Sequence, residues 1–136
     1  MNSAHPATIL IIEDETDIRL LYASYLSEKG LNVEQAQDGE IGLEKIKSID
    51  WDVLLLDIIL PNKDGVGILK EISVNKDLKK GAILLLTNLS NENIIEEAFS
   101  NGADGYIIKS EITPDDLYSE VKKYLKPKSE NPESTQ

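Results

Sequence analysis

The chain has 136 residues, a length typical of one domain, with 14 basic and 25 acidic residues and a formal net charge of −11. It has no cysteine and one histidine, which excludes a disulfide scaffold, a zinc–thiolate site and a cysteine nucleophile and disfavours a Ser-His-Asp triad. The acidity argues against direct binding of nucleic acid, which needs clustered lysine and arginine.

The apolar runs of the chain are short. Runs such as Val53–Leu56 and Ile83–Leu86 fall far below the roughly 20 residues that span a bilayer. Residues 1–7 lack the charged and apolar regions of a secretory signal. The sequence therefore predicts a cytoplasmic protein that does not enter a membrane.

Both ends of the chain are polar. Residues 1–7 are short and polar, and residues 127–136 contain prolines but no aliphatic side chain. We expect both segments to be disordered, the second being a frayed end or the start of a linker. Residues 8–126 would then form one folded domain, either standing alone or excised from a longer protein.

Short apolar runs between these ends are typical of strands covered on both faces of a parallel sheet. We expect Trp51, just before one of them, to be a partly packed loop residue. In chain order the predicted strands are Thr8–Ile12, a weaker run at Leu31–Ala36, Val53–Leu56, Ala82–Leu86 and Tyr106–Ile108.

Segments with helical spacing alternate with these runs. In the first, Ile18, Leu21, Tyr22, Tyr25 and Leu26 follow the pattern of an apolar helix face. The other apolar sets are Leu43, Ile46 and Ile49; Ile68, Leu69 and Ile72; Ile95, Ala98 and Phe99; and Leu117, Val121, Tyr124 and Leu125.

The last helix has a recognisable start. Thr113 stands at the N-cap position and Pro114 at the first helical position, with two acids following. Strands alternating with helices predict a (βα)5 order, in which right-handed crossovers place helices on both faces of one sheet. The predicted fold class is a doubly wound α/β parallel sheet, whose ligands lie at the carboxyl ends of the strands.

Chemically active side chains follow four of the predicted strands. Glu13 and Asp14 follow the first strand and Asp57 the third, while Thr87 and Lys109 follow the fourth and fifth. Each alone has an ordinary explanation, as a helix cap, a turn residue or a surface amine. Because the carboxyl ends of parallel strands share one edge, the joint pattern predicts a single site.

A cluster of Glu13, Asp14 and Asp57 would need a cation or raised pKa values. Two carboxylates about 4 Å apart repel by roughly 4 kcal/mol at an effective dielectric constant near 20. Oxygen ligands favour Mg²⁺ or Mn²⁺ over zinc, and Lys109 would add a second positive charge. A divalent ion and a lysine beside one carboxylate suit an incoming phosphoryl group. We therefore interpret the cluster as a phosphoryl-acceptor site.

The motifs around these residues resemble the receiver domain of bacterial two-component response regulators, over about residues 8–126. The resemblance implies a flavodoxin-like five-stranded sheet of order 2-1-3-4-5. It also implies a signalling protein, not an enzyme, that catalyses only its own phosphotransfer and autodephosphorylation. The motifs are Ile11–Glu15, Asp57–Pro61, Asp64-Gly65, Leu86-Thr87 and Gly102–Lys109.

By the same resemblance, Asp57 would accept a phosphoryl group from the phosphohistidine of a sensor histidine kinase or a histidine phosphotransfer protein. Asp14, Asp57 and the backbone carbonyl of Ile59 would hold Mg²⁺ or Mn²⁺ directly. Glu13 would act through a bound water, and Lys109 would pair with the phosphoryl oxygens.

The resemblance also implies a switch. Thr87 would donate its hydroxyl to the phosphoryl group, and Tyr106 would turn inward to fill the space that Thr87 vacates. The face bearing Tyr106, between the last two helices, is the expected binding surface for an unidentified output protein. A homodimer through the last two helices and the strand between them is compatible with the same resemblance.

Three residues depart from the family pattern. Glu13 stands where many relatives have aspartate, and Asn88 is larger than the small residue common after the switch hydroxyl. Ser110 follows Lys109 where relatives often have proline. The peptide bond before that proline is commonly cis, which costs about 3–4 kcal/mol for other residues.

Ile59 and Leu89 are predicted to border the path of the water that hydrolyses the aspartyl phosphate, and neither side chain can orient a water. Together with the bulk of Asn88, they would shield the phosphoryl group and prolong its lifetime. The alternative is that both point into surface packing and leave the kinetics unchanged.

Other functions fit the sequence less well. A pseudo-receiver that binds partners without phosphorylation usually lacks the acceptor or the lysine, whereas Asp57 and Lys109 are both present. A haloacid-dehalogenase-type enzyme needs Asp-x-Asp, and the second position is Ile59. Gly65-Val66-Gly67 begins like a dinucleotide-binding loop, but Lys70 occupies the place of its third glycine. The pseudo-receiver remains the main alternative.

Overall fold

The computed structural model describes residues 6–125 as one α/β unit. The segments expected to be disordered, residues 1–7 and 127–136, lie outside this range except for Pro6 and Ala7, which have no regular secondary structure. Within the described range, five strands alternate with five α-helices, as the sequence predicted.

All five strands are parallel and form one sheet of order β2-β1-β3-β4-β5. The predicted (βα)5 architecture and strand order are therefore confirmed. The strands are β1 (Thr8–Ile12), β2 (Asn32–Ala36), β3 (Val53–Leu56), β4 (Ala82–Thr87) and β5 (Gly105–Ile108). The helices are α1 (Thr16–Glu28), α2 (Gly39–Ser48), α3 (Gly65–Val74), α4 (Glu92–Ser100) and α5 (Pro114–Tyr124), and two short 3-10 turns are η1 (Lys76–Leu78) and η2 (Lys109–Glu111).

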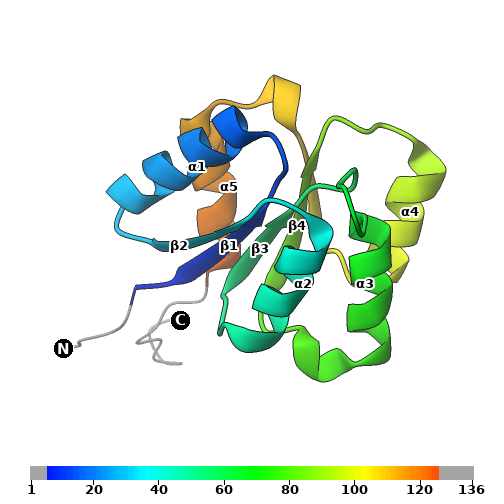
Figure 1. The fold of residues 1–136 in the computed structure, drawn as a ribbon. Helices are drawn as coiled ribbons and strands as arrows, with labels where there is room; N and C mark the ends of the chain where they lie inside the picture. Colours follow the sequence, from blue (N-terminus) through cyan, green and yellow to red (C-terminus); the bar gives the residue numbers. More distant parts are fainter. Residues whose placement is uncertain (1–5, 126–136) are drawn as a thin grey trace, which may run out of the picture.

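Helices cover both faces of the sheet, with α1 and α5 on one side and α2, α3 and α4 on the other (Figure 1). Successive strand residues point to opposite faces, so each strand contributes to two cores. Ile9 and Ile11 of β1 pack with α1 and α5, whereas Leu10 and Ile12 pack with the helices of the opposite face. Burial on both sides is why the strands read as nearly continuous apolar runs.

The apolar pattern misplaced a few side chains. The buried stripe of α1 includes Ala23, whereas Leu21 is 52% exposed, because the stripe facing the sheet is rotated away from it. Phe99 on α4 is also exposed. Trp51 is a loop residue, as expected, but it is fully buried and donates its indole N–H to the Ile46 carbonyl at 3.2 Å, so the expectation of partial packing was wrong.

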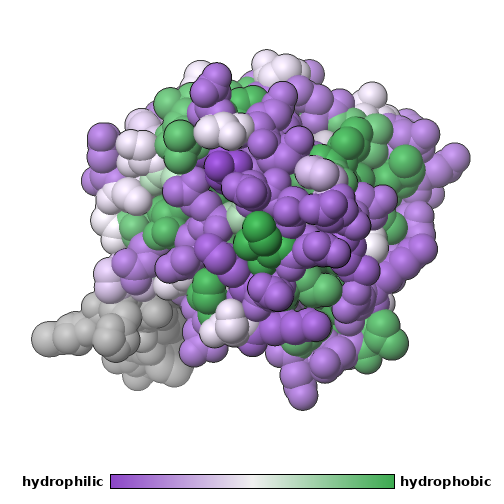
Figure 2. Space-filling view, viewed as in Figure 1, coloured by the Kyte–Doolittle hydropathy of each residue, from purple (hydrophilic) through white to green (hydrophobic). Residues whose placement is uncertain are grey.

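The helices are short, and α5 begins as predicted. The Thr113 hydroxyl accepts a hydrogen bond from the Asp116 N–H, and the Asp116 carboxylate accepts one from the Thr113 N–H. None of the helices in residues 6–125 combines the length and the apolar character needed to cross a bilayer. In the view of Figure 2, apolar side chains are scattered over a mainly hydrophilic surface.

Candidate functional site

The candidate site lies where four strands end at the carboxyl edge of the sheet. The strand order sets β1 beside β3 and β4 beside β5, so the residues after these strands meet there. Asp14, Asp57, Thr87 and Lys109 line an open cleft of about 650 Å³, while Glu13 is buried next to them. The cleft does not include Tyr106, which lines a separate groove against α5.

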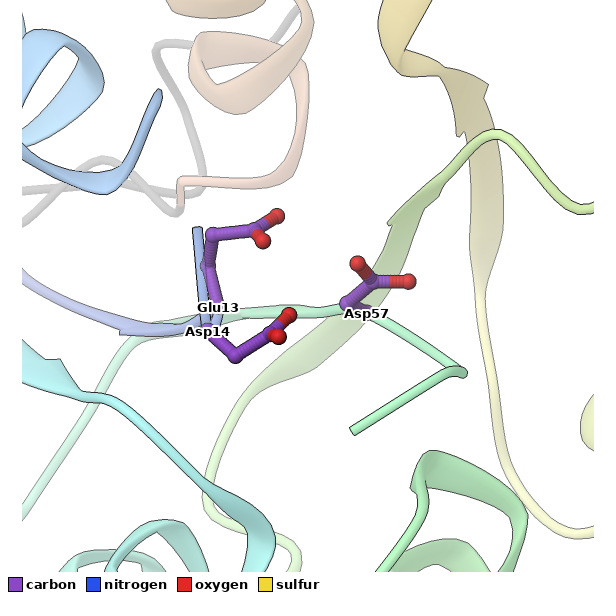
Figure 3. Close-up of side chains that lie close together, drawn as sticks. All are labelled: Glu13, Asp14 and Asp57. Carbon is purple, nitrogen blue, oxygen red and sulfur yellow. The ribbon is translucent and has the colours of Figure 1, made fainter. Parts of the chain in front are cut away.

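Three carboxylates lie close together at this edge (Figure 3). One oxygen each from Glu13, Asp14 and Asp57 lies within 4.8 Å of the other two. Glu13 and Asp57 are 1% and 5% exposed, whereas Asp14 is exposed. An all-oxygen donor set at this spacing suits a hard divalent cation better than zinc.

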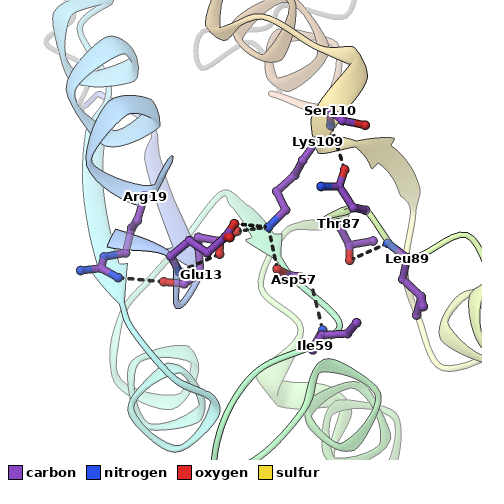
Figure 4. A network of polar contacts seen from close by, with 10 residues as sticks. Glu13, Arg19, Asp57, Ile59, Thr87, Leu89, Lys109 and Ser110 are labelled. Atoms are coloured by element: carbon purple, nitrogen blue, oxygen red, sulfur yellow. Dashed lines mark hydrogen bonds and ion pairs between the residues drawn. The ribbon is translucent and has the colours of Figure 1, made fainter. Parts of the chain in front are cut away.

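The ammonium group of Lys109 partly neutralises this cluster. Its Nζ donates to Glu13 Oε1 at 2.8 Å, to Asp57 Oδ2 at 2.9 Å and to Glu15 Oε1 at 3.3 Å (Figure 4). Burial by itself lowers the pKa of Lys109, but the hydrogen bonds to Glu13 and Asp57 more than offset burial and raise the pKa above its ordinary value. Lys109 is therefore a permanent cation of the site.

Burial of Glu13 disfavours the charged form of its carboxylate. Burial raises its pKa and the charge of Asp57 raises it further, while the hydrogen bonds from Lys109 and from the Glu15 backbone N–H act in the opposite direction. The pKa of Glu13 is raised overall. A bound cation would lower the pKa of Glu13 again, since it stabilises the charged form of the carboxylate.

Arg19 is a member of the site network that the sequence analysis missed. Its guanidinium donates to the Glu13 backbone carbonyl at 2.9 Å and to the side chain of Gln35 at 3.1 Å. These bonds tie the start of α1 to β2 and fix the β1–α1 loop that carries Glu13 and Asp14. The sequence shows an arginine in the first turn of a predicted helix, but its hydrogen-bond partners can be identified only from the fold.

Asp57 is held at the base of the cleft. Its Oδ1 accepts a hydrogen bond from the Ile59 N–H at 3.2 Å, and its Oδ2 accepts one from Lys109. The Ile59 side chain is 62% exposed and lines the cleft together with Leu89, which also packs partly against the core. Asp57 is thus oriented by two donors and still borders open space.

The loop after β4 is linked to β5. The Thr87 hydroxyl oxygen accepts a hydrogen bond from the Leu89 N–H at 3.2 Å, and the Tyr106 hydroxyl donates to the Leu89 carbonyl at 2.6 Å. Burial raises the pKa of Tyr106, and the nearby charge of Glu111 adds to this, so the phenol keeps its proton as a donor. Thr87 and Tyr106 therefore contact the same residue from two strands.

Two of the three residues that depart from the family pattern, Asn88 and Ser110, contact each other. The Ser110 N–H donates to Asn88 Oδ1 at 2.8 Å. Every peptide bond in residues 6–125 is trans, including that between Lys109 and Ser110. Lys109 nonetheless reaches Glu13 and Asp57.

Comparison with known proteins agrees with this geometry. The family model for the response regulator receiver domain matches residues 9–122. The transcriptional regulatory protein ResD of Bacillus subtilis is 29% identical over 126 residues, covering 93% of this chain and 51% of its own length. Response regulator RR06 of Streptococcus pneumoniae is 34% identical over 101 residues, covering 74% of this chain and 45% of its own. The chain thus spans about half the length of these curated relatives.

Solved structures show the same fold. The structure of the Vibrio cholerae chemotaxis protein CheY4 superposes with a TM-score of 0.80 at 28% sequence identity. The match covers 88% of this chain and 99% of that one.

Proposed function

This chain belongs to the response regulator receiver domain family, and from that premise we propose that Asp57 accepts a phosphoryl group from a phosphohistidine. The donor would be a sensor histidine kinase or a histidine phosphotransfer protein acting in the cytoplasm. The observation that carries the proposal is the acidic cluster of Glu13, Asp14 and Asp57, in which the ammonium of Lys109 contacts Glu13 and Asp57. Such a cluster attracts cations and is suited to phosphoryl chemistry.

In the proposed transfer, a carboxylate oxygen of Asp57 forms a bond to phosphorus while the bond from phosphorus to the histidine nitrogen breaks. The electron pair of that bond stays on the imidazole, and an aspartyl phosphate results. Lys109, 2.9 Å from Asp57 Oδ2, would exchange its carboxylate contacts for the phosphoryl oxygens. Its raised pKa supports this role, because the ammonium keeps its charge throughout.

We propose Mg²⁺ as the ion of the cluster, with Mn²⁺ as an alternative. Asp14, Asp57 and the backbone carbonyl of Ile59 would hold it, and Glu13 would act through a bound water. When bound, the ion supplies positive charge to the phosphoryl oxygens. The oxygen-only donor set and the raised pKa of Glu13 both support a cation at this position.

We propose that Thr87 and Tyr106 couple phosphorylation of Asp57 to a change in the surface that binds a partner. Thr87 would donate its hydroxyl to the phosphoryl group, and Tyr106 would take up the space that Thr87 leaves. Tyr106 lines a groove of about 430 Å³ between β5 and α5, with apolar and acidic side chains such as Ile112 and Glu120. This face would bind the output protein or, through α4, β5 and α5, a second copy of the chain.

The proposal is tested by incubating the protein with acetyl phosphate, with and without Mg²⁺, and measuring the intact mass. Wild-type protein should gain one phosphoryl group only when Mg²⁺ is present, and Asp57→Asn should gain none. Asp50→Asn, which changes an exposed aspartate at the opposite end of β3, is the matched control and should label as wild type does. Wild-type protein that stays unlabelled would favour the pseudo-receiver instead.

A further inference from the structure

The hydrogen bond between Asn88 and Ser110 joins the loop after β4, where Asn88 lines the cleft, to the turn after β5. Asn88 directly follows Thr87, the last residue of β4, and Ser110 directly follows Lys109, the first residue after β5. The parallel pairing of β4 and β5 ends with Thr87 opposite Ile108. The side chain of Asn88 therefore continues the connection between the strands beyond the last backbone pair.

Asn88 gives the Ser110 N–H a partner that the turn containing Ser110 does not provide, at an exposed position. Ser110 lies in η2, whose preceding residue Ile108 provides no side-chain cap. The first N–H groups of a helical turn have no partner within the turn. The Asn88 carboxamide oxygen satisfies the Ser110 N–H at 2.8 Å and fixes the peptide group that follows Lys109.

This bond restrains the two loops relative to each other. Among the described residues, it is the one hydrogen bond between residues 88–91 and residues 109–111. Tyr106 also holds the β4–α4 loop, but it does so from β5 and through the Leu89 carbonyl. Without the Asn88 contact, the segments that follow Thr87 and Ile108, the last backbone pair of β4 and β5, would have no hydrogen bond to each other among the described residues.

Resting on the proposed function, we propose that Asn88 is a positioning residue for phosphoryl transfer. By holding Ser110, its carboxamide sets the separation at which the Thr87 hydroxyl and the Lys109 ammonium contact the oxygens of one phosphoryl group. Displacements of about 1 Å in a catalytic arrangement can cost up to a hundredfold in rate. Asn88 does not touch the acidic cluster, so its effect falls on the transfer step and not on the binding of Mg²⁺.

Two substitutions separate the hydrogen bond of Asn88 from its bulk. Asn88→Ala removes both, whereas Asn88→Leu keeps a side chain of similar length without a hydrogen-bond acceptor. Asn93→Ala, at an exposed position on α4, is the matched control. Three quantities are measured for each: the rate of phosphorylation by acetyl phosphate at saturating Mg²⁺, the affinity for Mg²⁺ by calorimetry, and the hydrogen exchange of the Ser110 amide.

Asn88→Ala and Asn88→Leu should both slow phosphorylation by about tenfold and accelerate exchange at Ser110, with Mg²⁺ affinity within about twofold of wild type. The proposal is overturned if Asn88→Leu phosphorylates at the wild-type rate, because bulk would then be what matters. It is also overturned if Mg²⁺ affinity falls in step with the rate, because the whole site would then be disturbed. Wild-type protein that takes up no phosphoryl group would overturn the proposed function and the role of Asn88 with it.

Discussion

Asp14 is the exposed member of the acidic cluster, and its charge opposes those of Glu13 and Asp57 within 4.8 Å. Without Mg²⁺, Asp14→Asn should raise the free energy of unfolding by about 1 kcal/mol, the repulsion expected for two charges at such a distance in water. With Mg²⁺, wild-type protein should gain stability by binding the ion and the variant should gain much less. Urea unfolding with and without Mg²⁺ measures both effects.

Glu44→Gln, an exposed acid on α2, is the control for this experiment and should respond to Mg²⁺ as wild type does. If Asp14→Asn gains as much stability from Mg²⁺ as wild-type protein, Asp14 is not a ligand of the ion.

Ile59 and Leu89 line the cleft beside Asp57, and neither side chain can hydrogen-bond a water. Replacing Ile59 with Asn and Leu89 with Glu should therefore speed the loss of the phosphoryl group by about tenfold or more, equivalent to roughly 1.4 kcal/mol in the barrier. The decay of phosphorylated protein, followed by intact mass, measures this rate. Val74→Asn, an exposed aliphatic residue at the end of α3, should leave it unchanged.

An unchanged decay rate in the Ile59 and Leu89 variant, with phosphorylation intact, would show that these side chains do not shield the phosphoryl group. Leu89 both lines the cleft and packs partly against the core, so the test decides between shielding of the phosphoryl group and packing without an effect on the decay rate.

The sequence predicts a residue of the site where that residue directly follows a strand, because the strand then carries it to the edge of the sheet. Asp57, Thr87 and Lys109 follow apolar runs directly, and the edge of a parallel sheet gathers such residues. The hydrogen bonds of Arg19 and Asn88 could not be predicted, because they depend on the direction that each side chain takes once the loops are in place.

At the scale of elements, Gly65 at the start of α3 fixes the loop that follows Asp57. A Cβ at Gly65 would lie 2.5 Å from the Asp57 carbonyl oxygen and 2.7 Å from the Ile58 Cα. Gly65→Ala should therefore displace the backbone, lower the free energy of unfolding by about 1–3 kcal/mol and slow phosphorylation. Denaturant unfolding and labelling with acetyl phosphate measure the two effects.

Gly67, two residues along the same helix, is the matched control. Its Cβ would meet no atom closer than 3.4 Å, so Gly67→Ala should raise the stability by up to about 1 kcal/mol through helix propensity. Equal effects of the two substitutions would show that close packing under Asp57 does not position the acceptor.

The order of the elements was predictable because strands buried on both faces and helices buried on one face leave different patterns in the sequence. The rotation of α1 was not, since Leu21 and Ala23 differ in exposure only through the way the helix lies on the sheet. Trp51 was misjudged for a related reason: its ring fills a space that exists only once the chain after α2 has turned.

Across the whole molecule, the sheet edge links the acceptor to the face between α4 and α5. Thr87 and Tyr106 reach this link through opposite sides of Leu89, by its N–H and by its carbonyl. Shifting the population ratio of two conformers from about 10:90 to 90:10 takes about 2.6 kcal/mol. One hydrogen bond to a charged acceptor supplies about 1.5–3 kcal/mol, so the Thr87 hydroxyl is nearly sufficient alone.

Thr87→Ala should therefore still be phosphorylated but lose most of the phosphorylation-dependent change at Tyr106 and along α4 and α5. Amide chemical shifts recorded with and without acetyl phosphate measure this change. Thr87→Ser keeps the hydroxyl and should respond as wild type does. A full response in Thr87→Ala would mean that the signal travels by another route.

The central claim is that Asp57 itself carries the phosphoryl group, and locating the modified residue tests this most directly. Loss of labelling in Asp57→Asn would also follow from losing an ion ligand, so the bond must be located in wild-type protein. Borohydride reduces an aspartyl phosphate to homoserine, which peptide mass spectrometry identifies by position. We predict homoserine at position 57 alone. Reduction at Glu13 or Asp14, or a phosphoryl group on His5, would contradict the account.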